Sequence, residues 1–244
     1  HILVINKPPG VPVNPGGFAP RGQSPAPSLR ELLEPAYGRL WLVHRLDRDT
    51  SGVLVLARTA DAHRALNAQF EAHTPHKVYH ALVVGEPPWD EQDVELPLLP
   101  NGDRRHRTVV PRTETALRKA KRARTTLRVL ERFAGYALIE ARPHTGRTHQ
   151  VRAHLAALDL PIAADELYGG GPSLTLSDLA PAGTAGNPAA QAVPLIARQA
   201  LHARFLSLRH PHDRRELTFE APYPPDLAQT LAHLRQLASS SQAS

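Results

Sequence analysis

Short apolar runs separated by polar turns recur along this chain and predict a domain rich in β-strands. Runs of this length, rich in β-branched and bulky residues, are typical of buried or half-buried strands. The predicted strands are residues 2–5, 40–43, 53–57, 77–84, 125–132, 136–142, 201–211 and 217–222. The sixth follows the fifth after Phe133-Ala134-Gly135, so these two form a predicted hairpin.

Helical spacing of apolar residues appears between these strands. Ser28 is a predicted N-cap for a short helix, and Thr145 with Gly146 marks a second predicted helix start. The predicted helices lie within residues 28–40, 59–71, 145–158 and 226–237. Few strand–helix–strand units occur, so we expect an α+β fold with a mixed, largely antiparallel central sheet and flanking helices.

Three segments are predicted to have irregular structure. Residues 8–27 contain seven prolines, and residues 89–111 are polar and contain proline. Residues 180–194 are rich in Ala, Pro and Gly, and they predict a flexible insertion at about 172–197.

The composition predicts a globular chain of 244 residues, 41% of them hydrophobic, and we expect one catalytic domain over residues 1–244. No apolar run approaches the ~20 residues that span a bilayer, so no membrane partner is expected. The chain has no Cys, which fits a cytoplasmic protein. It also has no Met. We therefore expect a truncated N-terminus, with a possible RNA-binding module missing upstream.

The net charge of +6 is unevenly distributed. Residues 104–128 carry ten Lys or Arg and one acid, Glu114, so the rest of the chain is slightly acidic. A basic stretch on a near-neutral body suits a polyanion such as nucleic acid. A solvated loop remains an alternative interpretation.

The nonapeptide His44-Arg45-Leu46-Asp47-Arg48-Asp49-Thr50-Ser51-Gly52 lies between two of the predicted strands. So many polar groups at the edge of a core are costly unless they are paired or used. The stretch resembles the motif H-R-L-D-x-x-T-S-G of the RluA-type pseudouridine synthases. This resemblance implies that Asp47 is catalytic. The alternative is a structural turn in which Asp47 caps backbone amides and Arg45 pairs with an acid.

Further motifs of the same family follow in order over about residues 1–225. Ile2 to Gly10 is similar to a strand that runs into N-K-P-x-G, and Lys77 to Gly85 resembles K-x-Y-x-A-x-V-x-G. Pro143 to His154 resembles x-P-x-T-G-R-T-H-Q-[IL]-R-x-H. In a following motif, P-I-x-G-D-x-x-Y-G, Ala164 replaces the usual Gly, which leaves the backbone angle there open.

The resemblance implies roles for individual residues. Tyr79 would contact the target base, Arg152 would pair with Asp47, and Arg45 would help to extrude the base. The candidate catalytic residues are Asp47, Tyr79 and Arg152. The candidate substrate-binding residues are Arg45, His44, Lys7, Arg147, His149 and Gln150.

The implied fold is the pseudouridine synthase fold, two halves that flank a central cleft. The implied activity is an isomerase that converts uridine in structured RNA to pseudouridine, with rRNA expected ahead of tRNA. We expect a monomer that uses no cofactor. No metal site is expected either, because the chain lacks Cys and H-E-x-x-H, and His149 and His154 are five residues apart. A non-catalytic RNA-binding protein on the same scaffold and a hydrolase that uses Asp47 are the alternatives.

Overall fold

The computed structural model describes residues 1–14, 26–105, 107–179 and 193–242. The chain forms two compact units. Unit 1 comprises His1–Tyr79 and His202–Pro222, and unit 2 comprises His80–Leu201 and Tyr223–Ser244. Our expectation that residues 1–244 act as one catalytic domain stays a prediction. No described helix is long and apolar enough to cross a bilayer.

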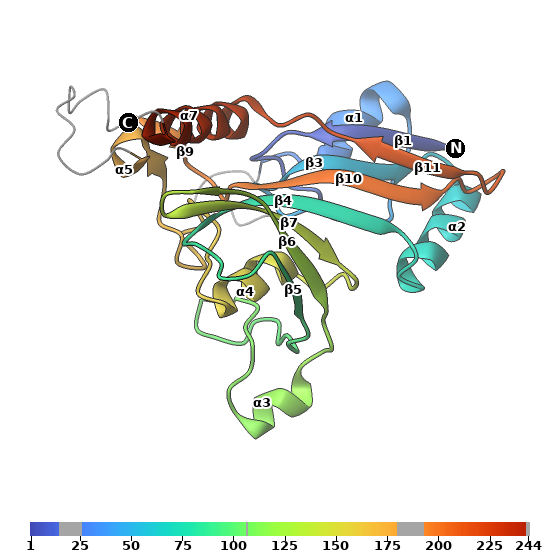
Figure 1. Ribbon diagram of the computed structural model, residues 1–244. Helices are drawn as coiled ribbons and strands as arrows, with labels where there is room; N and C mark the ends of the chain where they lie inside the picture. Colours follow the sequence, from blue (N-terminus) through green and yellow to red (C-terminus); the bar gives the residue numbers. More distant parts are fainter. Residues whose placement is uncertain (15–25, 106, 180–192, 243–244) are drawn as a thin grey trace. The chain divides into compact units, whose positions relative to one another are not determined.

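The strands of unit 1 surround β3 (Figure 1). They are β1 (Ile2–Lys7), β2 (Trp41–Leu42), β3 (Ser51–Ala57), the first part of β4 (His76–Val84), β10 (Leu201–Arg209) and β11 (Glu216–Glu220). The order is β1-β3-β10-β4, with β2 beside β3 and β11 beside β10. Antiparallel pairing joins β1, β2 and β3, and β10 with β11, whereas β3 and β10 are parallel where His202 lies opposite Ser51.

Strand β3 is buried on both faces, which positions the loop that precedes it. Val53 and Val55 pack with Leu206 of β10 and with α2 (Ala60–Glu71), and Thr59 caps that helix by accepting from the amide of Ala62. Leu54 and Leu56 face the other way, toward the side of α1 (Leu29–Tyr37). The alternation follows from the two-residue period of a strand.

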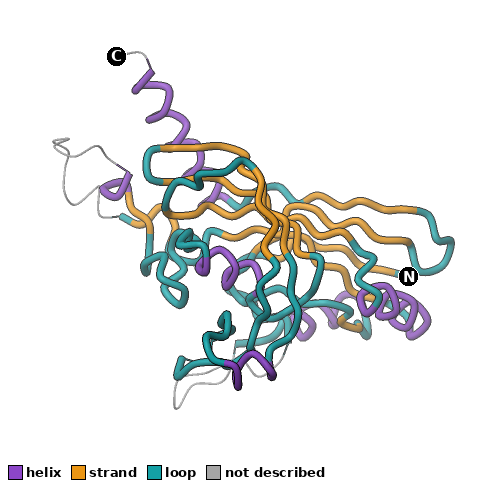
Figure 2. The backbone as a smooth tube through the Cα atoms, turned by 60° about the horizontal axis from the view of Figure 1, so that its bottom comes forward, coloured by secondary structure: helices purple, strands orange, loops and turns teal. Residues whose placement is uncertain are grey.

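Unit 2 is built on the strand order β4-β7-β6-β5. Its antiparallel centre is the hairpin of β6 (Thr125–Phe133) and β7 (Tyr136–Pro143), and β5 (Glu91–Val94) lies beside β6. The helices are α3 (Glu114–Lys119), α4 (Gln150–Ala157), α5 (Leu176–Leu179) and α7 (Pro225–Gln242), and a small strand pair consists of β8 (Leu174–Thr175) and β9 (Pro194–Ile196). Helix α3 lies in the long connection between β5 and β6, away from the strands (Figures 1 and 2).

The structure confirms the α+β class and the largely antiparallel sheet. It also confirms the helix that Ser28 caps, where Ser28 and Glu31 form a reciprocal capping box. Three segments contain regular structure that the sequence did not predict. Residues 89–111 contain β5, and residues 104–128 contain α3. The proposed insertion at 172–197 has β8, α5 and β9 at its two ends, while residues 180–192 lie outside the described residues.

Helix α4 begins later than expected from Thr145 and Gly146. Its N-cap is His149, which adopts a left-handed conformation (φ 53°) and caps no amide through its side chain. Residues 145–149 therefore form a turn before the helix, and Gln150 is the first helical residue.

Gly52 offers a test of this fold, because its φ of +117° and its close approach to β10 both exclude a side chain. A Cβ atom there would lie 2.2 Å from the carbonyl oxygen of Ala203. We expect Gly52→Ala to lower the free energy of unfolding by about 3 kcal/mol in urea titrations. Gly38→Ala is the control, because Gly38 also has positive φ but open space around it. Equal losses in the two variants would contradict the close approach.

Candidate active site

The loop of residues 44–50 connects β2 to β3 in unit 1 and carries Asp47. Leu46 is buried in the core cluster that includes Leu54 and Leu56. The amide of Thr50 donates to the carbonyl oxygen of Asp47 at 3.2 Å, which closes a turn. Asp47 itself is partly exposed. The backbone is thus anchored on both sides while the carboxylate stays within reach of solvent.

Lys7 fixes this loop from inside unit 1. Its side chain is fully buried, and its Nζ donates to the carbonyl oxygens of Pro8 at 2.8 Å, Val11 at 3.0 Å and Arg48 at 2.8 Å. An ammonium group has three donors, and these three carbonyls occupy them. Lys7 thereby joins the loop after β1 to the residue that follows Asp47, and its contact with substrate stays a prediction.

His44 is also held by contacts within unit 1, and its contact with substrate stays a prediction. Its Nε2 accepts from the amide of Val55 at 3.0 Å, and its ring stacks on Phe70 with 4.7 Å between ring centroids. Burial, assisted by the charge of Lys77, lowers the pKa of His44 from 6.5 to about 3. The imidazole is therefore neutral at neutral pH and acts as an acceptor for β3.

Tyr79 on β4 lies near Asp47 in unit 1. The Tyr79 ring packs against the cluster that contains Leu46 and Ala203. Burial raises the pKa of Tyr79 above its usual value, and the charge of Asp47 raises it further. The phenol therefore stays protonated at neutral pH beside the carboxylate.

Lys77 was not among our candidate residues, although its position two residues before Tyr79 places it on the same face of β4. Burial lowers the pKa of the Lys77 amine from 10.5 to about 8. This residue can therefore gain or lose a proton near neutral pH. The sequence signal was the K-x-Y spacing.

The start of β3 is fixed by a buried histidine that sequence reasoning also missed. His202 is fully buried, its Nδ1 lies 2.9 Å from Ser51 Oγ, and its Nε2 lies 3.1 Å from the carbonyl oxygen of Ala221. Because a carbonyl only accepts, Nε2 carries the proton, and Nδ1 accepts from the Ser51 hydroxyl. His202 thereby ties the T-S-G end of the motif to β10 and to the residue after β11.

Arg152 lies on α4 in unit 2, and its guanidinium forms an ion pair with the carboxylate of Asp165. Nε and Nη2 donate to the two Asp165 oxygens at 2.7 and 2.8 Å, and both side chains are buried. Our expectation made Asp47 the partner of Arg152. That contact would join the two units and would use the remaining Nη1 edge, so it stays a prediction.

Tyr168 covers this ion pair. The Arg152 guanidinium lies 4.9 Å from the centroid of the Tyr168 ring. The Tyr168 hydroxyl accepts from the amide of Thr108 at 3.1 Å and donates to the Thr108 carbonyl oxygen at 3.0 Å. In the same segment Ala164 has φ 57°, the left-handed conformation in which the usual Gly would be unstrained.

The turn before α4 is held by Gln150, whose side chain is fully engaged. Its Oε1 accepts from Thr145 Oγ1 at 2.6 Å and from the Arg147 amide at 3.1 Å. Its Nε2 donates to the Arg124 carbonyl at 2.8 Å and to Thr125 Oγ1 at 2.9 Å. Gln150 is 4% exposed and holds this turn, and its contact with substrate stays a prediction.

Three candidate substrate-binding residues remain open to solvent to different degrees. Arg45 is exposed, and it makes neither a hydrogen bond nor an ion pair with any residue that the structure describes. Arg147 is partly buried and donates through Nε to the carbonyl of Arg122 at 3.1 Å. His149 is partly buried, with Nδ1 at 3.1 Å from the Tyr168 hydroxyl. Their contacts with substrate stay predictions.

Asp47 and Tyr79 both lie in unit 1, where the charge of Asp47 raises the pKa of the Tyr79 phenol, whereas Arg152 lies in unit 2. The convergence of all three stays a prediction. Within the described part of the chain, no group of three His, Asp or Glu side chains is arranged to hold a metal ion.

Comparison with known proteins gives consistent matches. The profile of a family described as RNA pseudouridylate synthase matches residues 1–157. The ribosomal large subunit pseudouridine synthase D of Nitrosomonas europaea is 37% identical over 249 residues, which cover 99% of this chain and 65% of that protein. An uncharacterised RNA pseudouridine synthase of Chloroflexus aurantiacus is 39% identical over 96% of this chain and 67% of its own length. The chain therefore spans about two thirds of these relatives.

Solved structures show the same fold. The human RNA pseudouridylate synthase domain containing 4 has a TM-score of 0.68 and 29% identity, with 96% of this chain and 90% of that chain covered. The human RNA pseudouridylate synthase domain containing 1 has a TM-score of 0.67 at 24% identity, with 96% and 91% covered, and it supports the fold alone.

The contribution of Lys7 to stability can be tested by removing its charge and its hydrogen-bond donors together. Lys7→Met keeps much of the volume but leaves buried carbonyl oxygens without donors, each worth ~1–3 kcal/mol. We expect the free energy of unfolding to fall by about 3 kcal/mol or more in urea titrations. Lys119→Met, at an exposed lysine of α3, should change it by less than about 0.5 kcal/mol. A stable Lys7→Met protein with weaker RNA binding would instead support the predicted substrate contact of Lys7.

His44 predicts a pH dependence of stability. Its pKa of about 3 in the folded protein lies below 6.5, so the unfolded chain binds the proton first as the pH falls. Stability should therefore fall between about pH 6.5 and 3, with a slope of up to ~1.4 kcal/mol per pH unit. His44→Gln keeps an acceptor for Val55 and should flatten this slope, as measured by urea unfolding from neutral to acidic pH. His212→Gln, at an exposed histidine, is the control, and an unchanged slope in His44→Gln would contradict the assignment.

Proposed function

This chain belongs to the RNA pseudouridylate synthase family, and we propose that it is an isomerase that converts uridine to pseudouridine in structured RNA. The observation that carries the proposal is the position of Asp47 on a loop held by Lys7, in the unit that also contains the partly buried Tyr79, whose pKa the charge of Asp47 raises. Relatives named as ribosomal large subunit pseudouridine synthases favour large-subunit rRNA as the substrate over tRNA.

The reaction needs one carboxylate near the sugar. The bond between N1 of uracil and C1′ of ribose breaks, the base turns, and a bond forms between C5 and C1′. A proton leaves C5 and N1 gains one, so atoms and electrons balance without a redox partner, group donor or metal. Glycosidases apply paired carboxylates to a comparable carbon. In our proposal, Asp47 acts alone, as nucleophile or as proton acceptor from the sugar.

Tyr79 is the proposed cover for the base. Its phenol is protonated at neutral pH, so it suits hydrogen-bond donation more than removal of a proton. Lys77, with a pKa of about 8, is the better proton carrier on the same face of β4. Arg152 would support the site through the guanidinium that Asp165 already positions.

RNA binding requires cations outside the site. In residues 104–128 most Lys and Arg side chains are exposed. Six exposed cations make no ion pair with any described residue, namely Arg104, Arg105, Arg112, Lys119, Lys121 and Arg122. We propose that they contact phosphates, which positions RNA without reading its sequence. Arg45 would act differently. It lies two residues before Asp47 and would fill the gap that the flipped uridine leaves in the base stack.

The proposal includes no cofactor, a monomeric protein and a cytoplasmic location. The absence of Cys and the ribosomal role named for the relatives support the location.

Asp47→Asn tests the chemistry. The amide keeps the shape of the side chain but lacks the charge, so we expect pseudouridine formation to fall below detection while RNA affinity stays within about twofold. The assay is carbodiimide mapping of unmodified large-subunit rRNA after incubation with the protein. Asp49→Asn, in the same loop, is the matched control and should retain activity. Turnover by Asp47→Asn would exclude the mechanism, and binding without turnover by the wild-type chain would favour an RNA-binding protein.

The basic stretch is tested by replacing Arg112, Lys119, Lys121 and Arg122 with Ala. We expect weaker binding to all RNAs and a smaller dependence of affinity on salt, by ~0.7–0.9 for each phosphate that these cations neutralise in the wild-type complex. Fluorescence anisotropy at several salt concentrations measures both. The control is Glu114→Ala with Arg118→Ala, which removes an exposed ion pair from α3 without changing the net charge. An unchanged salt slope in the first variant would make this stretch a solvated loop.

A further inference from the structure

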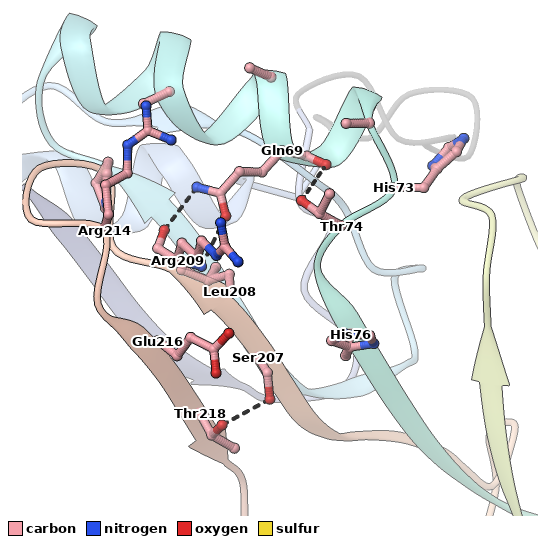
Figure 3. Close-up of a pocket in the computed structure, with 14 residues that line it drawn as sticks. Gln69, His73, Thr74, His76, Ser207, Leu208, Arg209, Arg214, Glu216 and Thr218 are labelled. Carbon is pink, nitrogen blue, oxygen red and sulfur yellow. Dashed lines mark hydrogen bonds between the residues drawn. The ribbon is translucent and has the colours of Figure 1, made fainter.

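A polar pocket of about 820 Å³ lies in unit 1 at the far end of β10 from the Asp47 loop. Its wall is formed by the C-terminal half of α2, the turn from α2 to β4, the end of β10 and the start of β11 (Figure 3). The Asp47 loop precedes Ser51, which lies opposite His202 at the start of β10. Arg209 is seven residues further along that strand, a distance of ~20 Å. The mechanism proposed above does not use this pocket.

Backbone groups in the wall of the pocket already have hydrogen-bond partners within the protein. Gln69 of α2 donates through Nε2 to the Arg209 carbonyl at 2.8 Å and accepts through Oε1 from the Arg209 amide at 2.9 Å (Figure 3). The glutamine amide therefore closes the end of β10 as a neighbouring strand would. Nearby, Ser207 and Thr218 share a hydrogen bond of 2.9 Å between their hydroxyls. The shape of the pocket is thus fixed without a ligand.

Its charged side chains remain available. Arg209 and Arg214 are exposed, and neither makes an ion pair with a residue that the structure describes. His73 and His76 add two imidazoles to the lining, and Glu216 is the one acid in it. Neighbouring arginines outside the pocket behave differently, since Arg64 pairs with Asp61 and Arg215 with Asp213. Arg209 and Arg214 therefore keep their charges available to a ligand, whereas these two neighbouring arginines do not.

The end of β10 also shares a strand face with Ala203, which packs in the same cluster as Tyr79. Leu206 and Leu208 pack with α2, whereas Ala203 packs in the cluster that Tyr79 joins. Because side chains alternate along a strand, Ser207 and Arg209 project on the side of Ala203. The two polar pocket residues of β10 therefore lie on the strand face opposite to Leu206 and Leu208.

We propose that this pocket binds the ribose–phosphate backbone of the RNA substrate at a point remote from the target uridine. This inference rests on the proposed function and adds a second RNA contact to it. Arginine forks suit phosphate oxygens, while Glu216 and the two hydroxyls suit a ribose 2′-hydroxyl, which both donates and accepts. The pocket is also far larger than a single phosphate needs. A separation of ~20 Å corresponds to ~6 steps of a duplex strand at ~3.4 Å each.

The test compares two RNA stem-loops with the same uridine-containing loop and stems of about 4 or about 12 base pairs, chosen to end before or beyond this span. The variant is Arg209→Ala with Arg214→Ala, and fluorescence anisotropy measures Kd. We expect Kd for the long stem-loop to rise about tenfold and Kd for the short one to change less than about twofold. The control, Arg64→Ala with Arg215→Ala, removes two exposed arginines from the same helix and hairpin outside the pocket, and should leave both values within about twofold.

Equal losses on the long and short RNA, or equal losses in the control, would overturn the proposal in favour of general charge attraction. No loss at all would exclude RNA from the pocket, and a free anion or a protein partner would then be its occupant. Pseudouridine formation by the wild-type chain is measured separately on the same RNAs. If no RNA is modified but the length-dependent loss appears, the proposed function fails while the pocket assignment stands. If RNA is modified but the length-dependent loss does not appear, the pocket assignment fails while the proposed function stands.

Discussion

The buried ammonium group of Lys7 is the constraint on which the candidate site depends. It links carbonyl oxygens of Pro8 and Val11, after β1, to that of Arg48, next to Asp47. A buried cation is tolerated only when its donors are used, so the two loops must keep this arrangement. At the other end of the motif, His202 bonds Ser51. The backbone of Asp47 is therefore held from both sides, and a carboxylate on such a support needs little reorganisation to act.

Two carboxylates in this protein have different surroundings. Asp165 is buried and bidentate to Arg152, so its function is to keep that guanidinium charged and oriented. Asp47 is partly exposed and lies beside a phenol whose pKa it raises. Removing one partner of a buried pair costs ~3–5 kcal/mol, so loss of Arg152 would reduce stability through Asp165 whether or not Arg152 reaches Asp47. Activity lost on changing Arg152 would thus be weak evidence about catalysis unless stability is measured alongside.

The sequence predicted most strands, because alternating apolar residues reflect burial directly, and it predicted α1 because Ser28 and Glu31 form a local capping box. It missed β5, whose residues Glu91–Val94 have no apolar alternation and form a strand only because β6 offers an edge. In the site, the motifs marked the residues that matter without saying what they contact. Lys7, His44 and Gln150 bond to their own chain, and burial of this kind is decided by tertiary packing. The pair of Arg152 and Asp165 joins residues 13 apart that no periodicity links.

The spread of unpaired cations over both units has a physical reason if the substrate is RNA. A carboxylate such as Asp47 repels the phosphates that flank the target uridine, and it must be brought close to the sugar despite that repulsion. Binding energy from remote contacts can offset this cost without interfering at the reacting atoms. Exposed cations without ion pairs, such as Arg112 and Lys121 in unit 2 and Arg209 and Arg214 in unit 1, can supply that energy at a distance from Asp47. Whether each cation has an ion-pair partner, more than the net charge of +6, then determines which surfaces of this chain attract RNA.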